Sequence, residues 1–129
     1  MLCYNVNEKL VIFMKLIHYI NGEKESTHKN LKNLCDKNEK KYKFFLDNIS
    51  NYIYITDRLI FIRENDDYKF ELEISNKPTC LLTLIKENKC FDINVISSSY
   101  KDNGSYIDIE YELESDDGDK HHIILEIEE

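Results

Sequence analysis

Apolar and polar residues alternate along most of the chain from about residue 42 onward, and clusters of turn-forming residues interrupt this alternation at short intervals. In the clearest segment, 106–114, acidic residues occupy one face and four apolar residues share the other: Ile107, Ile109, Tyr111 and Leu113. The further segments predicted as strands are 42–47, 52–56, 59–63, 68–74, 91–95 and 122–127, together with 79–85, which is almost wholly apolar and therefore expected in the centre of the sheet. The pattern predicts roughly seven to eight strands.

Strands that recur every 8 to 12 residues or so are typical of an antiparallel sandwich or barrel. The connections between the predicted strands are too short for the crossovers that parallel strands need. Each strand has one polar face, so the apolar faces must pack against one another. We therefore expect a mainly β fold, in which residues 42–129 form an antiparallel meander that closes into a barrel or a sandwich.

The first forty residues have a different pattern. Residues 10–20 are apolar enough for a first strand, which would end at the turn formed by Asn21 and Gly22. The Lys-rich segment 24–43 has apolar residues at helical spacing, with Ser or Thr before them as a helix cap. These residues are Leu31, Leu34 and Cys35, with Ser26 or Thr27 as the cap. One short helix is therefore expected near the N-terminus.

Length and composition agree with one globular domain, residues 1–129. Apolar residues make up 42% of the chain and charged residues 33%, which favours a packed core over disorder. No apolar run approaches the roughly 18 residues of a membrane span, so we expect a soluble protein without membrane contact. Residues 102–129 contain eleven acidic residues and one Lys. Such a region repels phosphates, so nucleic acid is not an expected partner.

The N-terminus and the cysteines indicate the compartment. The apolar run 10–17 is interrupted by Lys15 and lacks a small-residue cleavage site, so no signal peptide is expected. Met14 is a second possible start, in which case residues 1–13 would be dispensable for the fold. The cysteines at positions 3, 35, 80 and 90 match neither a zinc pattern nor a dense disulfide framework. We expect free thiols and a cytoplasmic protein.

No metal site or other cofactor is expected. Four carboxylates share one strand face: Asp108, Glu110, Glu112 and Glu114. Neighbours on that face are about 7 Å apart, too far for both to reach one ion easily. Segment 116–119 lacks the spacing and the terminal Glu of a calcium loop. His121 and His122 are adjacent and point to opposite faces of a strand. His18 and His28 are distant in sequence from that pair.

No catalytic residue is expected either. The candidate nucleophiles are the four thiols and the serines of segment 97–99. Neither is accompanied by a nucleophile elbow, an oxyanion-type glycine or a nearby base. We therefore expect a protein that is not an enzyme.

Arg63 is the one candidate ligand-binding residue. It continues the strand face of Leu59 and Phe61, and an inward Arg in a closed barrel would meet an anionic ligand. The opposite face, with Ile60 and Ile62, is an equally apolar candidate for the interior and would leave Arg63 in water. A cavity of a few hundred cubic ångströms with Arg63 inside it would favour ligand binding, and a solid interior would favour a protein-interaction module.

Three stretches carry a resemblance to a known family: 59–63, which ends in Arg, 90–96, and 104–114 with its alternating Ile, Tyr and Leu residues. They resemble strands of the YwiB-like bacterial proteins, whose members look like calycins, small lipocalin-type antiparallel barrels. Glu64 and Asn65 stand where that family usually has a glycine, and segment 88–90 stands where it has an aromatic-Gly corner. The first fifty residues match poorly. The resemblance implies a lipocalin-like barrel and supplies no activity.

The leading functional hypothesis is a non-enzymatic barrel that binds a small apolar or anionic molecule, since a barrel of about eight strands can hold one small ligand. The alternative is a protein-interaction module that uses its acidic strands or the Lys-rich segment against a partner.

Overall fold

The computed structural model describes residues 8–38, 41–46 and 48–129, and these residues form one antiparallel sheet without a helix. Within them lie eleven strands: β1 (Glu8–Ile20), β2 (Glu23–Asn38), β3 (Lys41–Leu46), β4 (Ile49–Ile55), β5 (Leu59–Glu64), β6 (Tyr68–Ile74), β7 (Thr79–Leu84), β8 (Lys89–Asp92), β9 (Asn94–Asp102), β10 (Tyr106–Glu114) and β11 (Lys120–Glu128). The described part of the chain has no helix that is long and apolar enough to cross a membrane.

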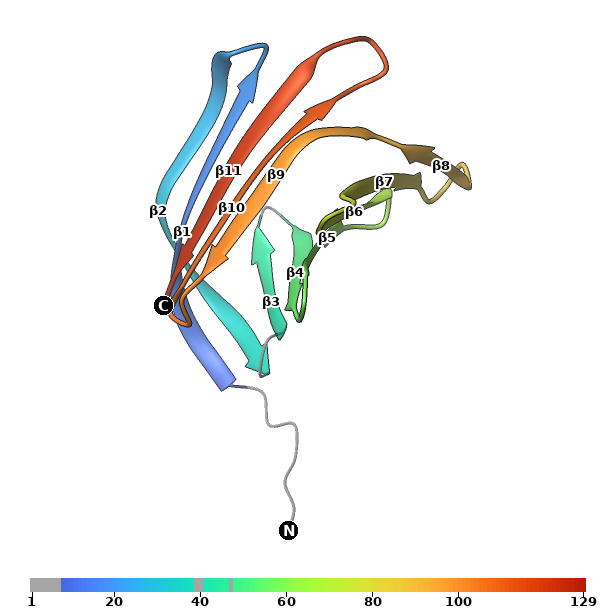
Figure 1. Ribbon diagram of the computed structural model, residues 1–129. Helices are drawn as coiled ribbons and strands as arrows, with labels where there is room; N and C mark the ends of the chain where they lie inside the picture. The colour runs from blue at the N-terminus through green and yellow to red at the C-terminus, as the bar shows by residue number, and fades with distance from the viewer. Residues whose placement is uncertain (1–7, 39–40, 47) are drawn as a thin grey trace.

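The sheet curls into a nearly closed barrel (Figure 1). Its strand order is β8-β7-β6-β5-β4-β3-β2-β1-β11-β10-β9, so strands that follow each other in sequence are neighbours in the sheet except β8 and β9, and the last strand pairs with the first. The strands β8 and β9 are the two edges, yet only Ile93 separates them along the chain. The Ile93 N–H donates to the Cys80 carbonyl on β7 at 2.9 Å, and β9 also contacts β6. The expected antiparallel sheet is therefore confirmed, but residues 42–129 form two meanders, β3 to β8 and β9 to β11, which the hairpin of β1 and β2 joins in the sheet.

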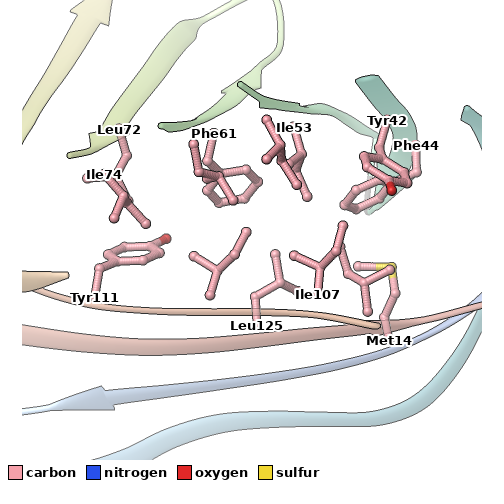
Figure 2. Packing of buried hydrophobic residues seen from close by; sticks show 14 of the residues in the cluster. Met14, Tyr42, Phe44, Ile53, Phe61, Leu72, Ile74, Ile107, Tyr111 and Leu125 are labelled. Atoms are coloured by element: carbon pink, nitrogen blue, oxygen red, sulfur yellow. The ribbon is translucent and has the colours of Figure 1, made fainter. Parts of the chain in front are cut away.

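The core lies between the two walls of this barrel (Figure 2). Because side chains alternate along each strand, every second residue points inward, and these inward positions are the apolar ones. In β10 the four residues expected to share an apolar face are all buried. One wall contributes Tyr42, Phe44, Ile53, Phe61, Leu72 and Ile74, and the facing wall contributes Met14, Ile107, Tyr111 and Leu125.

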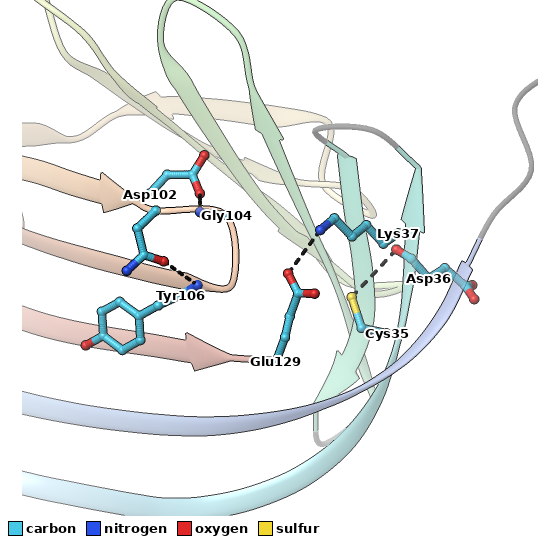
Figure 3. A network of polar contacts seen from close by, with 8 residues as sticks. Cys35, Asp36, Lys37, Asp102, Gly104, Tyr106 and Glu129 are labelled. Carbon is cyan, nitrogen blue, oxygen red and sulfur yellow. Dashed lines mark hydrogen bonds and ion pairs between the residues drawn. The ribbon is translucent and has the colours of Figure 1, made fainter.

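A polar network ties strands together at the end of the barrel where β2 and β11 finish (Figure 3). Lys37 of β2 forms an ion pair of 3.0 Å with Glu129, and this hydrogen bond raises the pKa of Lys37. In the β9–β10 turn, the Asp102 carboxylate accepts a hydrogen bond from the Gly104 N–H at 2.9 Å. Gly104 has a φ of 97°, a conformation that glycine adopts without a steric penalty.

The helix expected within segment 24–43 is wrong, because this segment forms most of β2. Cys35 is 1% exposed and Leu34 is 64% exposed, so these neighbours point to opposite faces, as residues of a strand do. Pairing with β1 along almost the whole of β2 satisfies its backbone groups. This long-range pairing overrides the helical spacing of the leucines, which by itself is a weak local signal.

From residue 41 onward the described residues of the sheet form nine strands, β3 to β11, where seven or eight were expected, because segment 91–95 divides at Ile93 into β8 and β9. The strand expected at 10–20 is β1, and β2 is a further strand. The serines of 97–99 lie in β9 and pair with β10. Small polar residues suit this position because β9 is an edge strand whose side chains are partly in water.

Residues 8–13 form the first half of β1, and Ile12 has no exposed surface. Met1 to Asn7 lie outside the described residues, so the start at Met14 stays a prediction. A chain that began at Met14 would lose the pairing of Leu10 with Cys35 and the buried side chain of Ile12.

Candidate functional site

A cavity of about 290 Å³ lies inside the barrel near the β10–β11 turn. Its walls combine apolar side chains with a small group of polar ones that can carry or donate protons. The apolar lining is Phe70, Leu82, Ile93, Leu113 and Ile123, and the polar lining is His18, Arg63, Tyr68, Tyr111, Ser115 and His121. None of these lining residues is acidic. The cavity is therefore mainly apolar, with one group of positively charged and hydrogen-bonding side chains.

Three aromatic rings form the border between this cavity and the core. Phe61 is 2% exposed and belongs to the core, while Phe70 and Tyr111 line the cavity. The ring centroids lie 6.4 Å apart for Phe61 and Phe70, 6.4 Å for Phe61 and Tyr111, and 6.0 Å for Phe70 and Tyr111. At these distances the rings attract one another in tilted or edge-to-face geometry. The packed rings close the cavity on the side of the core.

Arg63 points into the barrel from β5. Leu59 and Phe61 on the same face are buried, so of the two alternatives for this strand the first is the one that the structure adopts. The Arg63 Nε–H donates to the Oδ1 of Asn51, which lies directly opposite it on β4, at 2.9 Å. Among the described residues, no carboxylate forms an ion pair with Arg63.

Asn51 holds the guanidinium of Arg63 in place. Its side chain is 1% exposed, and its Nδ2 donates to the Ile49 carbonyl at 3.0 Å. This second bond fixes which way the amide points, so that the Oδ1 must face Arg63. The donors of the two Nη atoms remain for other partners in the cavity. Once β4 and β5 are paired, the sequence places a buried asparagine directly opposite the inward arginine, and this juxtaposition is the feature that would reveal their hydrogen bond.

Two histidines lie side by side in the wall. His18 Nε2 and His121 Nδ1 are 3.0 Å apart, and their ring centroids are separated by 5.2 Å. The pair exists because β1 and β11 are adjacent: His18 pairs with Ile123, so His121 is its diagonal neighbour on the same face. Sequence reasoning treated the two as unrelated, since they are 103 positions apart.

The chain just before His121 is hydrogen-bonded to the turn that follows β1. The Asn21 N–H donates to the Lys120 carbonyl at 2.8 Å, and the Lys120 N–H donates to the Asn21 Oδ1 at 2.9 Å. The Asn21 Nδ2 donates in addition to Asp119 at 3.0 Å. These three bonds fix the register of β1 against β11 and thereby the spacing of the two imidazoles.

Burial and nearby positive charge set the protonation of the site. Burial lowers the pKa of His18; His121 and Arg63 lower it further, and Glu25 opposes them. Burial also raises the pKa of Tyr111, which is 3% exposed, although Arg63 acts in the other direction. Both shifts favour the neutral form of the side chain. The guanidinium of Arg63 brings a positive charge to the same cavity.

The remaining candidates stand apart from this cavity. The four carboxylates from Asp108 to Glu114 lie on the outer face of β10, where burial and the neighbouring Glu126 and Glu110 raise the pKa of Asp108. Within the described residues, no group of three or more His, Cys, Asp or Glu side chains could hold a metal. Cys35, Cys80 and Cys90 are free thiols, whereas Cys3 and the side chain of His28 lie outside the described residues.

Comparison with known proteins supports the fold alone. Neither a model of a protein family nor a curated protein matches the chain. Among solved structures, the chain is similar to the crystal structure of the ywiB protein from Bacillus subtilis, with a TM-score of 0.59 and 9% sequence identity. The match covers 95% of this chain and 92% of that chain. The chain therefore shares the fold of that protein over nearly its whole length.

Proposed function

We propose that this protein is a non-enzymatic, calycin-like barrel that binds a small anion with an apolar body in the Arg63 cavity. The observation that carries the proposal is an inward arginine, held by a buried asparagine, without a carboxylate partner among the described residues. Removing a guanidinium from water costs free energy unless a partner of opposite charge compensates it. A carboxylate, sulfate or phosphate group on the ligand would be that partner, and Arg can bind such groups through two parallel hydrogen bonds.

The rest of the cavity suits the organic part of such a ligand. A volume of about 290 Å³ is at the small end of ligand pockets, which are mostly apolar with a few polar groups that fix orientation. Leu82, Ile93 and Ile123 supply the apolar surface opposite the polar side chains. An anion without an apolar part would leave this surface in contact with water and gain less from binding.

Ser115 argues for binding without catalysis. Ser115 carries the one aliphatic hydroxyl among the residues that line the cavity, and serine hydroxyls are common nucleophiles in enzymes. Its Oγ, however, forms hydrogen bonds with Asp117 Oδ1 at 2.5 Å and with the Asp119 carbonyl at 3.2 Å. A nucleophilic serine would instead give its proton to a base such as His121. The turn thus uses this hydroxyl to shape the backbone.

The two arginines of the chain allow a matched test. We expect native mass spectrometry of protein purified from its own cells to show a retained small molecule, and calorimetry to show binding of phenyl sulfate. Arg63→Gln should weaken phenyl sulfate binding at least about tenfold, because a charge-assisted bond contributes roughly 1.5–3 kcal/mol. Arg58→Gln is the control, since Arg58 lies in the exposed β4–β5 turn and pairs with Glu73 at 3.2 Å. Equal affinity in both variants, or no binding of phenyl sulfate to the wild type, would contradict the proposal.

A second candidate function rests on the outer face of β1 to β3. Apolar side chains there are unusually exposed for their size: Val11 41%, Phe13 46%, Leu34 64% and Phe45 57%. Exposed lysines accompany them, and the Lys43 Nζ lies 5.7 Å from the centre of the Phe45 ring. Contiguous apolar surface of this kind marks interaction sites, and the lysines would favour an acidic protein partner.

This second function predicts a salt-sensitive complex. A partner should co-purify at about 50 mM salt and dissociate at about 500 mM, because salt screens exposed charges. Leu34→Ser should abolish co-purification by removing apolar contact. Ile96→Ser, at an equally apolar and 42% exposed site on β9, should leave it intact. Loss of the partner in both variants would place the interaction elsewhere.

A further inference from the structure

We propose that the cavity selects a doubly charged headgroup, that of a phosphate monoester, and that the His18–His121 pair takes up one proton when the headgroup binds. This inference rests on the proposed function, because it concerns the same cavity. Its basis is the contact of 3.0 Å between His18 Nε2 and His121 Nδ1, which line the same cavity as Arg63.

The contact between the two rings limits how many protons they can hold. A hydrogen bond between two imidazole nitrogens needs one N–H and one lone pair, so only one of the two facing atoms carries a proton. The outer nitrogens, His18 Nδ1 and His121 Nε2, can then carry one proton between them in the neutral pair or one each in the protonated pair. A second proton on the facing atoms would break the bond and place two cations in contact. The pair therefore gains at most one positive charge while it stays intact.

The groups around the pair come from five strands and two turns. Glu25 of β2 is exposed and favours protonation of His18, while Arg63 of β5 opposes it. Tyr68 of β6 and Tyr111 of β10 line the same cavity. The acidic side chains of the β10–β11 turn are engaged locally, Asp117 with Ser115 and Asp119 with Asn21. On β11, His122 points away and contacts Glu110 at 2.6 Å on the outer face.

These charges disfavour protonation of the histidine pair in the free protein and favour it when an anion is bound. Without ligand, burial and Arg63 both disfavour an imidazolium at His18. A bound anion reverses the local sign, since an opposite charge within about 4–6 Å favours the charged form. Arg63 and the protonated pair then carry one positive charge each. A phosphate monoester, with a charge near −2 above its second pKa of about 6, neutralises both, whereas a sulfate monoester neutralises one.

The oxygen atoms of a phosphate also match the donors. Arg63 keeps its Nη donors after the Nε–H has bonded Asn51, and the protonated pair adds an outer N–H on each ring. The apolar residues Phe70, Leu82 and Ile93 would contact the esterified group. The structure thereby points to a phosphate ester with a small apolar substituent.

The test compares phenyl phosphate with phenyl sulfate by isothermal titration calorimetry. At pH 7.5 phenyl phosphate should bind about tenfold more tightly, one additional charge contact being of this order. Phenyl sulfate keeps a single charge throughout, so a change in its affinity with pH reports on the protein. Its affinity should rise as the pH falls from 8 to 6, and its binding heat should differ between Tris and bis-Tris buffers, because a proton is taken up.

Adjacent histidines supply the variant and its control. His121→Gln should abolish the pH dependence for phenyl sulfate and the preference for phenyl phosphate, while His122→Gln, on the outer face, should keep both. If His121→Gln fails to fold, the calorimetric proton uptake of the wild type decides. Phenyl sulfate binding that depends on Arg63 but not on pH, with no preference for phosphate, would overturn this inference and leave the proposed function standing. Absence of binding by both probes would overturn both.

Discussion

Replacing Phe44 with Ala is expected to lower the free energy of unfolding by about 3–5 kcal/mol. Phe44 is 1% exposed and is among the largest fully buried side chains of the described residues. It lies against the facing wall of the barrel (Figure 2), so its removal leaves a cavity that the surrounding strands can only partly close. Since small domains are stable by roughly 5–15 kcal/mol, this single change removes much of the total.

Phe45 is the matched control for Phe44, on the next position of the same strand. It is 57% exposed, so Phe45→Ala should change the free energy of unfolding by less than about 0.5 kcal/mol. Urea denaturation followed by circular dichroism measures both variants. Equal losses would mean that β3 does not alternate between interior and solvent, and a larger loss for Phe45 would place the core on the other face of the sheet.

The strands that sequence predicted best are those with one apolar and one charged face. In 68–74 and 106–114 the predicted bounds coincide with β6 and β10, because alternation over seven or more residues has few other physical explanations. The strand β2 was missed because Lys, Asn and Glu outnumber its apolar residues, and these polar types carry no period of their own. What makes it a strand is its partner β1, which no local pattern reveals.

The same distinction holds for the candidate site. Arg63 could be identified from sequence because it continues the apolar face of its own strand, and only the choice between two faces remained open. The contact between His18 and His121 follows from closure of the barrel, which brings β1 next to β11. A meander that closes into a barrel pairs its first strand with its last. Applied to the predicted strands 10–20 and 122–127, this rule places His18 and the histidines at 121 and 122 next to each other in the sheet.

The buried thiols of the folded protein should react with a thiol reagent far more slowly than the same thiols in the unfolded chain. Burial raises the pKa of Cys35 to about 11 and that of Cys80 to about 12. Because the thiolate is the reactive form, its fraction at pH 8 falls by about 100-fold for Cys35 and about 1,000-fold for Cys80 relative to an ordinary thiol. The Cys35 Sγ also donates to the Asp36 carbonyl at 3.6 Å (Figure 3), which keeps its proton engaged. Cys90 is exposed on the edge strand β8 and should react at once.

A Cys3→Ser background makes this measurable with Ellman's reagent at pH 8. We expect one fast thiol per folded chain and three in urea, with Cys90→Ser removing the fast one. The result for Cys80 also reports on closure of the barrel, since its carbonyl accepts the hydrogen bond from Ile93 where β7 meets the β8–β9 connection. If Cys80 reacted as quickly as Cys90, the barrel would open between β7 and β9 under native conditions. The cavity lined by Ile93 and Leu82 would then be accessible from the side, and ligands would enter through this seam instead of past the β10–β11 turn.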